Sequence, residues 1–361
     1  QMDLTASQAI YREVLGKSLY ANRPLKKGET ILRDDIIVMS PGQGIPPNKI
    51  DQLIGICSPR NMNEGDVFFT SDLKPTSSGP RDFNFQRPFG IPVRYHDFSK
   101  LHTMSNFKFV EFHLSYKDME IDLDQFFKAH YDLEFTVHCP ELFANDHVLD
   151  LCSLDESYRA RSIEEVQRVI EVTLKLKKYF KKTDPPLIII NVGGHSQNSP
   201  LPVSERQILY GLALESLSKL DQEGVELIPQ SMPPFPWHFG GQRFQNLFVD
   251  ATEIADFCQN NNYRVCLDIS HSKLACNHYK WSFKSFIESV APYSAMFHIV
   301  DASGVDGEGL QIGEGEVDFA LLGEQLNALA PNSGFIPEIW QGHKNDGEGF
   351  WIALERLEKW F

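Results

Sequence analysis

The stretch RVCLDISHS, residues 264–272, joins a short apolar run to a polar turn. Val265, Cys266 and Leu267 are typical of a buried strand, and Asp268 and His271 follow where that strand ends. A carboxylate and an imidazole at this spacing can bind a metal ion. They can equally form a strand-end turn, in which Asp268 accepts backbone N–H groups and His271 is solvated. The rest of the chain has to decide between these interpretations.

The same strand-then-polar pattern recurs from residue 89 to the end of the chain. Apolar runs of strand length occur at 89–95, 107–114, 133–138, 187–192, 225–229, 263–268, 295–300 and 334–339. Helical patterns lie between them, among others at 121–131, 162–180, 204–220 and 248–261. Strands and helices alternating in this number predict an α/β fold of the (β/α)8 TIM barrel type. The alternative is an open doubly wound sheet, but no glycine-rich phosphate-binding turn follows the first strand.

The first part of the chain has a different rhythm. A helical pattern at 5–15 precedes short apolar runs separated by turn signals. Residues 75–88, PTSSGPRDFNFQRP, are rich in proline, serine and glycine and resemble a linker. We therefore expect a small loop-rich domain at 1–74, a linker at 75–88 and the barrel at 89–361.

Composition excludes several classes of partner. The net charge of −15 would repel a polyanion, so nucleic acid is not an expected partner. The six cysteines include no CxxC pair, which suits a reducing cytoplasm. No apolar run approaches the length of a membrane span, and no signal-peptide pattern opens the sequence. We therefore expect a cytoplasmic protein that binds neither membranes nor nucleic acid.

Polar residues collect at the predicted strand ends, where the strands of a TIM barrel converge on one mouth. These residues are His138, Asn191, Gln230, Asp268, His298, Asp301 and Glu338, with His195 and His271 just beyond their strands. Their common position is hard to explain by packing, because the strands themselves are apolar. The pattern predicts a shared functional site.

Residues 1–74 carry a family resemblance. The segments KSLYA (17–21), KKGE (26–29), PGQGIPP (41–47) and NEGDVFFTSDL (63–73) occur in the order found in the antifreeze-like (SAF) domain, a β-clip fold, of sialic acid synthases. The resemblance implies a module that lies over a barrel mouth and helps to hold an acylated amino sugar. A basic residue normally precedes the Pro-Gly pair, whereas Ser40 precedes Pro41 here. This departure argues against direct contact of the module with the sugar.

Residues 89–361 resemble the xylose-isomerase-like superfamily, which includes sugar isomerases and epimerases and endonuclease IV. The segment IGEGEVDF (312–319) is similar to its G-E-G turn. In its epimerases, one divalent ion is held by residues on strands five to eight, and two glutamates shuttle a proton. The resemblance places these roles at Gln230, Asp268, His298 and Glu338. It also places His271 among the catalytic residues, near the substrate oxygens.

Gln230 stands where the epimerases have a glutamate. An amide oxygen can bind a metal, but it carries no charge and cannot accept a proton near neutral pH. We therefore expect one weakly bound Mn2+, Mg2+ or Zn2+ ion, with Glu338 as the remaining base. A one-base isomerase, a chemistry that uses other residues, and a site that only binds all remain open.

The endonuclease resemblance is weaker. Its three-metal site needs further ligands at positions that are Asn191, Gly307 and Gly309 here, while His138 is retained. These residues cannot build a trinuclear cluster, which argues against DNA repair.

Several further residues are candidates for substrate binding, together with His138. Glu111 and His113 share one face of strand two and either point into the site or form a buried structural pair. His195 either reaches the mouth or is solvated. Trp237 and Arg243 lie in a proline-rich loop that either binds a sugar face and an anionic group or packs on the rim.

These observations predict a metal-assisted sugar isomerase or epimerase in nonulosonic (sialic-acid-like) sugar biosynthesis. Its substrate would be an amino sugar, or a phosphorylated or nucleotide-linked form of one. The alternative is a catalytically reduced barrel that binds a sugar or organises a partner. We expect a homo-oligomer or association with a synthase barrel. Because SAF modules normally follow a synthase barrel, we also consider that this chain is the C-terminal part of a longer polypeptide.

Overall fold

The computed structural model describes residues 16–40, 42, 44–73, 78–236, 243–305 and 307–361. The chain divides into two compact units, Gln1–Gly79 and Pro80–Phe361, and each is described by itself. The predicted helix at 5–15 and the candidate Trp237 lie outside the described residues.

The first unit is small and loop-rich, as predicted. Strand β1 (Ser18–Ala21) pairs antiparallel with β2 (Ile36–Met39). The short helices are η1 (Arg33–Asp35), η2 (Pro47–Gln52) and α2 (Thr70–Leu73). Its own core includes the fully buried Leu19, Ile31, Leu53 and Phe68. Many backbone hydrogen bonds join its loops, so an irregular chain still satisfies its polar groups.

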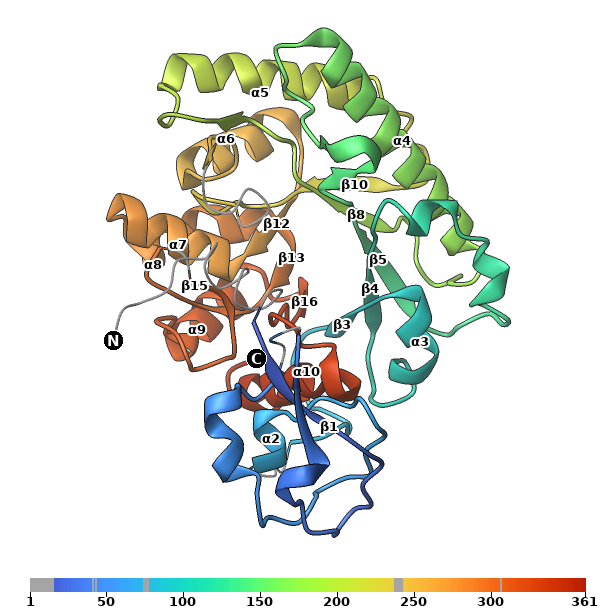
Figure 1. Cartoon of the computed structure of the whole chain (residues 1–361). Coiled ribbons are helices and arrows are strands. Elements are labelled where there is room, and N and C mark those ends of the chain that lie inside the picture. Colours follow the sequence, from blue (N-terminus) through green and yellow to red (C-terminus); the bar gives the residue numbers. More distant parts are fainter. Residues whose placement is uncertain (1–15, 41, 43, 74–77, 237–242, 306) are drawn as a thin grey trace. The chain divides into compact units, whose positions relative to one another are not determined.

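The second unit is a closed barrel of eight parallel strands (Figure 1). Strands β3 (Gly90–Val93), β4 (Phe109–His113), β5 (Glu134–His138), β8 (Leu187–Ile190) and β10 (Glu226–Pro229) form one sheet in this order. Strands β12 (Val265–Asp268), β13 (Ser294–His298) and β16 (Gly334–Ile336) form the other. The parallel bridges Phe89–Phe335 and Gln230–Cys266 join the two sheets at both seams. The predicted (β/α)8 barrel and its eight strands are therefore confirmed.

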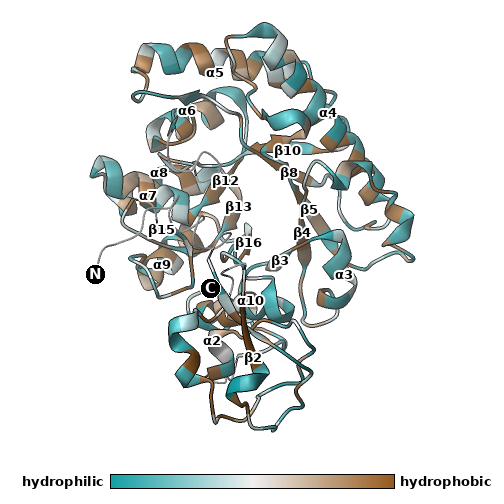
Figure 2. Cartoon of the chain, viewed as in Figure 1, coloured by the Kyte–Doolittle hydropathy of each residue, from teal (hydrophilic) through white to brown (hydrophobic). Residues whose placement is uncertain are grey.

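Helices surround this barrel. They are α3 (Tyr95–Leu101), α4 (Glu156–Lys177), α5 (Val203–Ser218), α6 (Ala251–Asn261), α7 (Ile269–Tyr279), α8 (Phe283–Val290), α9 (Phe319–Leu329) and α10 (Lys344–Leu357). Side chains of Asp155, Asp250, Asp268, Ser282 and Asp318 cap the first turns of five of them. Figure 2 shows the strands mostly in hydrophobic colours and the outer helices in mixed ones. This contrast is expected for strands that are buried on both faces.

The connections carry short elements of their own. They are β6 (Leu142–Phe143), β7 (His147–Val148), β9 (His195–Ser196), β11 (Phe244–Gln245), β14 (Asp301–Ser303), β15 (Gly307–Leu310), η3 (Asp118–Glu120), η4 (Leu123–Gln125), η5 (Ala144–Asp146) and η7 (Ala291–Tyr293). The hairpin of β14 and β15 carries a residue of the site described below.

The helix predicted at 121–131 is wrong. The chain forms only the 3-10 turn η4 there, capped by Asp122, and then runs on without regular structure. Phe127 is buried and packs against the rings of Phe98 and Phe112, at centroid distances of 5.4 and 5.7 Å. The apolar spacing therefore reflects aromatic side chains that fill the core from an irregular segment, because tertiary packing outweighs local periodicity.

Residues 80–88 belong to the barrel unit. Phe83 and Arg87 are buried in it, and the Arg87 guanidinium lies over the rings of Phe297 and Phe361. Burial lowers the pKa of Arg87 to about 10, which still leaves it charged at neutral pH. This segment therefore packs at the side of the barrel where the strands begin, opposite the predicted site.

The six cysteines are free thiols, and all except Cys57 are buried. Burial raises the pKa of Cys266 to about 12, so this thiol behaves as a small apolar side chain. Among the described residues, no helix has the length and apolar character that crossing a membrane would require.

Candidate functional site

The carboxyl ends of the barrel strands bring a set of polar side chains together. Because parallel strands all end at the same side of a barrel, residues far apart in sequence meet there. The set consists of Glu111 and His113 on β4, His138 on β5, Gln230 after β10, Asp268 on β12, His298 on β13 and Glu338 after β16. The structure therefore brings together the four predicted metal-site residues and three of the predicted substrate-binding residues.

His298 lies at the centre of this set and is fully buried. Its Nδ1 is 2.8 Å from Glu338 Oε2, 3.1 Å from Gln230 Nε2 and 3.7 Å from Asp268 Oδ2. Its Nε2 is 3.1 Å from Glu111 Oε1, an ion-pair contact without the alignment of a hydrogen bond. Burial opposes protonation, but the charges of Glu338 and Glu111 outweigh it and raise the pKa of His298 well above its usual value.

Glu111 and His113 form a pair inside the barrel. Glu111 is fully buried and accepts hydrogen bonds from Thr136 Oγ1 at 3.0 Å and from His113 Nε2 at 2.9 Å. Burial would raise the pKa of Glu111, but His298 and His113 hold it well below its usual value. His113 is partly exposed and lines the cavity described below. Glu111 thus contacts His113 and His298 from the barrel interior, and His113 forms part of the cavity surface.

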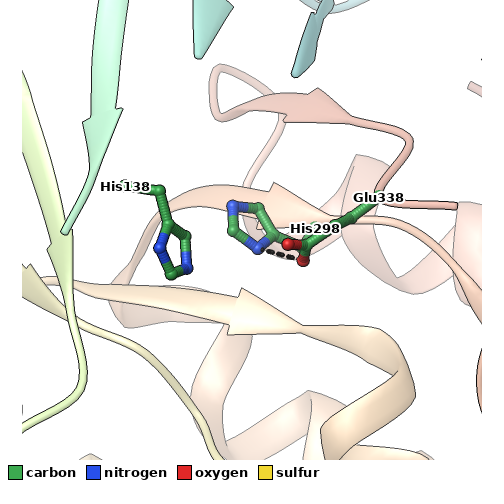
Figure 3. Close-up of side chains that lie close together, drawn as sticks. All are labelled: His138, His298 and Glu338. Atoms are coloured by element: carbon green, nitrogen blue, oxygen red, sulfur yellow. Dashed lines mark ion pairs between the residues drawn. The ribbon is translucent and has the colours of Figure 1, made fainter. Parts of the chain in front are cut away.

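His138 faces the same centre. Figure 3 shows its ring directed towards the contact between His298 and Glu338. Its Nδ1 is 3.1 Å from the Cys139 carbonyl oxygen, and its Nε2 is 3.2 Å from Gln230 Oε1. Burial, together with the charge of nearby His113, lowers the pKa of His138.

Asp268 forms the turn cap of one interpretation of the opening stretch, whereas His271, which that interpretation expected to be solvated, is buried. Its Oδ1 accepts a hydrogen bond from the backbone N–H of His271 at 2.8 Å and caps helix α7. Its Oδ2 faces the site, 3.2 Å from Gln230 Nε2. One carboxylate therefore serves as both a turn cap and part of the polar centre.

His271 is held between a backbone carbonyl and a carboxylate. Its Nδ1 is 2.8 Å from the Ser231 carbonyl oxygen, and its Nε2 is 3.0 Å from Glu308 Oε1. Burial would lower the pKa of His271, but Asp268 and Glu308 outweigh this effect and raise it to about 10. His271 is therefore a cation at neutral pH, and Glu308 contacts the imidazole that was expected to lie near the substrate oxygens.

Glu308 is the site residue that sequence reasoning missed. It lies on β15, and the backbone N–H of Trp340 donates to the Gly309 carbonyl oxygen at 2.9 Å. This bond holds Glu308 next to the segment that follows Glu338. A sequence signal was present, because GEG at 307–309 comes shortly before the G-E-G turn at 313–315.

A cavity of about 440 Å3 opens beside these groups. Its polar lining includes His113, Asp268, Glu308 and Glu338. Its apolar lining consists of Pro92, Val93, Val300, Ile339, Trp340 and Phe350, and Arg94, His96, Asp97 and His343 also contribute. This combination of apolar walls and a few convergent polar groups is typical of a small-molecule site.

Other predicted residues lie elsewhere. His195 on β9 pairs with Gln245 on β11, the strand that begins directly after Arg243. Neither His195 nor Arg243 lines this cavity. Asp301 is fully buried and accepts backbone N–H bonds from Gly313 and Gly315, both at 2.9 Å. It therefore shapes the G-E-G turn and has no part in the site. Asn191 caps its own loop through Gly193 N–H.

The donor atoms fit a divalent cation. His298 Nδ1 lies 2.8 Å from Glu338 Oε2 and 3.7 Å from Asp268 Oδ2. Donors that bind a cation at ~2.1 Å stand ~3 Å apart, so this spacing matches a coordination shell. Ligand atoms of His138, His298 and Glu338 also lie within 4.8 Å of one another. Two carboxylates and an imidazole suit Mn2+ or Zn2+.

Comparison with protein families agrees with this architecture. Residues 99–360 match the model of the xylose isomerase-like TIM barrel family. The chain belongs to this family. Residues 16–74 match the SAF domain. The chain is therefore a SAF domain joined to a xylose isomerase-like barrel.

Solved structures of similar fold include several sugar epimerases. A D-tagatose 3-epimerase-like protein is 20% identical, with a TM-score of 0.51, and the match covers 75% of this chain and 98% of that one. A D-allulose 3-epimerase from Methylomonas sp. in complex with D-allulose is 13% identical, with a TM-score of 0.53 and coverage of 78% and 100%. A 3-keto-D-glucoside 4-epimerase from E. coli is 13% identical, with a TM-score of 0.51 and coverage of 76% and 99%. At such identities the likeness shows the fold. A search of curated proteins found no significant match.

Proposed function

We propose that the barrel catalyses metal-assisted proton transfer at the carbon next to a sugar carbonyl, with Glu338 as the base. One observation carries this proposal. Glu338 contacts the buried His298 at 2.8 Å and also lines the cavity, with 29% of its side chain exposed. A base needs both properties, because it must reach the substrate while its own orientation is fixed.

The protonation state of Glu338 supports the same role. Burial would raise the pKa of Glu338, but His298 and the neighbouring histidines hold it well below its usual value. Glu338 is therefore ionised at neutral pH and able to accept a proton. A carboxylate of low pKa is a weak base, so the substrate C–H bond must be made more acidic. A cation held by Asp268, His298 and Glu338 would supply this by polarising the carbonyl group.

The proposed step conserves atoms and charge. Glu338 takes the hydrogen of the carbon next to the carbonyl as a proton. The electron pair of that C–H bond forms a C=C bond, and the carbonyl oxygen takes up the negative charge. If the carbon that lost its proton carries a hydroxyl group, the hydroxyl proton moves to the former carbonyl oxygen, and return of the proton from Glu338 to the former carbonyl carbon gives the isomer. If that carbon carries an acylamino group, the proton can return only to the same carbon.

Epimerisation needs a second acid, because the proton must return to the same carbon from its other side. Gln230 cannot supply this proton at neutral pH. Glu308 lines the same cavity and lies 3.0 Å from the protonated His271, so the Glu308–His271 pair is the candidate for this second acid, with the His271 proton passing through Glu308 to the carbon. The presence of this carboxylate keeps epimerisation as a second candidate reaction.

For the substrate we propose an acylated amino sugar or a related sugar of nonulosonic biosynthesis. The SAF match at 16–74 supports this class. In the barrel, Trp340 is about half exposed and lines the cavity, so its indole offers a face on which a sugar can stack. Arg94, also in the lining, offers a guanidinium for a carboxylate or phosphate. Association with a second copy or with a synthase barrel remains a prediction.

Deuterium exchange tests this function. We would incubate the protein with Mn2+ in D2O, with D-allulose, D-tagatose and N-acylated hexosamines in turn, and follow the proton next to the carbonyl by NMR. We expect loss of that signal for at least one sugar, abolished by Glu338→Gln and retained by Glu314→Gln, which changes an exposed carboxylate. Sugar binding without exchange would instead identify a binding barrel, as the uncharged Gln230 would favour.

A further inference from the structure

The amide of Gln230 has polar partners at both ends. Its side chain is buried, with Oε1 3.2 Å from His138 Nε2, and Nε2 3.2 Å from Asp268 Oδ2 and 3.1 Å from His298 Nδ1. An amide presents a donor at one end and an acceptor at the other, so its orientation decides which partners are satisfied.

In the orientation just given, the contact with His298 is poorly matched. His298 Nδ1 also lies 2.8 Å from Glu338 Oε2, and a carboxylate accepts a hydrogen bond. If Nδ1 carries the hydrogen that Glu338 accepts, two N–H groups face each other across the 3.1 Å between Gln230 and His298. The favourable contact with Asp268 is then offset by an unfavourable one.

Rotating the side-chain amide of Gln230 by 180° exchanges the positions of its oxygen and nitrogen and so reverses these contacts. The carbonyl oxygen then faces the site, together with Asp268 Oδ2, Glu338 Oε2 and His298 Nδ1. Two oxygens that face each other at 3.2 Å repel, unless a positive charge lies between them. A divalent cation removes this repulsion and uses all four donor atoms, with His298 keeping its hydrogen on Nε2, towards Glu111.

His138 provides the partner that this turned amide needs. A carbonyl oxygen can only accept, so the contact of 3.1 Å with Cys139 places the ring hydrogen of His138 on Nδ1. In the neutral ring, Nε2 then has a lone pair pointing at Gln230. This lone pair matches the N–H of the turned amide. With a cation bound, the Gln230 amide therefore has a suitable partner at each end.

We propose that His138 is a positioning residue, which takes an N–H of Gln230 and thereby turns the Gln230 oxygen onto a divalent cation shared with Asp268, His298 and Glu338. The inference rests on the metal site of the proposed function. It explains how an uncharged residue serves at a position where the resemblance implied a carboxylate. It also gives His138 a role outside the coordination shell, as an orienting partner of a ligand.

The test is a double-mutant cycle on Mn2+ affinity, measured by calorimetry on the full chain. His138→Phe keeps a ring against His113, whose ring centroid lies 4.9 Å away, but removes the lone pair. We expect it to weaken Mn2+ binding about tenfold to a hundredfold, as for other orienting partners of ligands. His130→Ala, at an exposed histidine, should leave binding unchanged.

The decisive comparison is the Mn2+ affinity of Gln230→Glu with and without the additional substitution His138→Phe. A carboxylate presents oxygen at both ends and needs no orienting partner, so His138→Phe should then have no effect on affinity. An equal loss in both backgrounds would overturn the proposal and show His138 to be a ligand itself. If His138→Phe fails to fold, His138→Ala gives the same comparison.

A spectroscopic readout on the unmodified protein gives an independent answer. Electron spin echo modulation of bound Mn2+ detects coordinated imidazole nitrogen, and we expect one, from His298. Two coordinated imidazoles, or no Mn2+ binding at all, would overturn the inference. The deuterium exchange experiment reports on the proposed function separately, because it measures chemistry on a sugar and needs no variant of His138.

Discussion

Glu338 Oε2 lies 2.8 Å from His298 Nδ1, so a carboxylate that faces the cavity is tied to an imidazole that is completely buried. The two residues follow neighbouring parallel strands, β13 and β16. Their contact joins the polar interior of the barrel to the surface where a ligand would bind. Glu308 and Asp268 border the same cavity.

Restoring a carboxylate at position 230 should strengthen metal binding. In Gln230→Glu, the new charge lies beside Asp268 in a buried site, so we expect a loss of about 2 kcal/mol of stability without metal. With Mn2+ the sign should reverse, because the cation offsets the third carboxylate. Thermal unfolding of both proteins with and without Mn2+ measures this. Equal metal-induced shifts would show that position 230 is not in the site.

Glu308→Gln should separate two reactions at the same carbon. If Glu308 delivers the second proton, this variant retains deuterium exchange by Glu338 but forms at least tenfold less epimer. NMR in D2O records both quantities in one experiment. Glu324→Gln, at an exposed position on α9, is the matched control. Unchanged epimer formation would remove Glu308 from the mechanism.

Gly309→Ala should disturb the cavity wall. Gly309 has a φ of +73°, and a Cβ there would meet Trp340 Cβ at 2.9 Å. We expect a loss of about 2 kcal/mol, combining left-handed strain with displacement of Trp340. Gly313→Ala has a similar φ of +81° but meets nothing within 4 Å, so it isolates the strain. Urea unfolding should show the larger loss for Gly309→Ala, and equal losses would refute the steric argument.

The buried His147 should make stability fall in mild acid. Its Nε2 is 2.9 Å from Ser162 Oγ, and burial lowers its pKa in the folded state. As the pH falls below about 6.5, His147 therefore becomes protonated in the unfolded chain before it does so in the folded protein. The free energy of unfolding decreases over this range, until the pH falls below the lower pKa of His147 in the folded state. Unfolding free energies between pH 5 and 8 should show a steeper decline for the wild type than for His147→Gln. Parallel curves would contradict this assignment.

The strands and the positions at their ends were accessible from sequence for a physical reason. Each strand is an apolar run bounded by turn residues, and parallel strands in a barrel end at one mouth. This is why Asp268 and Glu338, far apart in the chain, were expected together. The dual use of Asp268 as cap and site residue could not be foreseen, because it depends on which oxygen faces helix α7.

The positions of loop residues were harder to predict, because the periodicity of a sequence does not indicate where a loop brings its side chains. His195 was a candidate from its place after a strand, yet its segment pairs with β11. Glu308 was missed because a hairpin, which carries no strand-end signal, delivers it to the cavity. The segment 121–131 shows the converse, since helical spacing there reflects aromatic packing around Phe127.

The metal content of the purified protein reports on the single-ion site that the proposed proton transfer requires. Protein prepared without chelator, and again after loading by equilibrium dialysis against buffer that contains Mn2+, would be analysed by mass spectrometry of its metals, with the free Mn2+ subtracted, alongside Asp268→Ala. We expect at most one divalent ion per chain, close to one after loading, and strong depletion in Asp268→Ala. Two or three tightly held ions per chain, or no retention after loading, would contradict a single-ion site for sugar proton transfer.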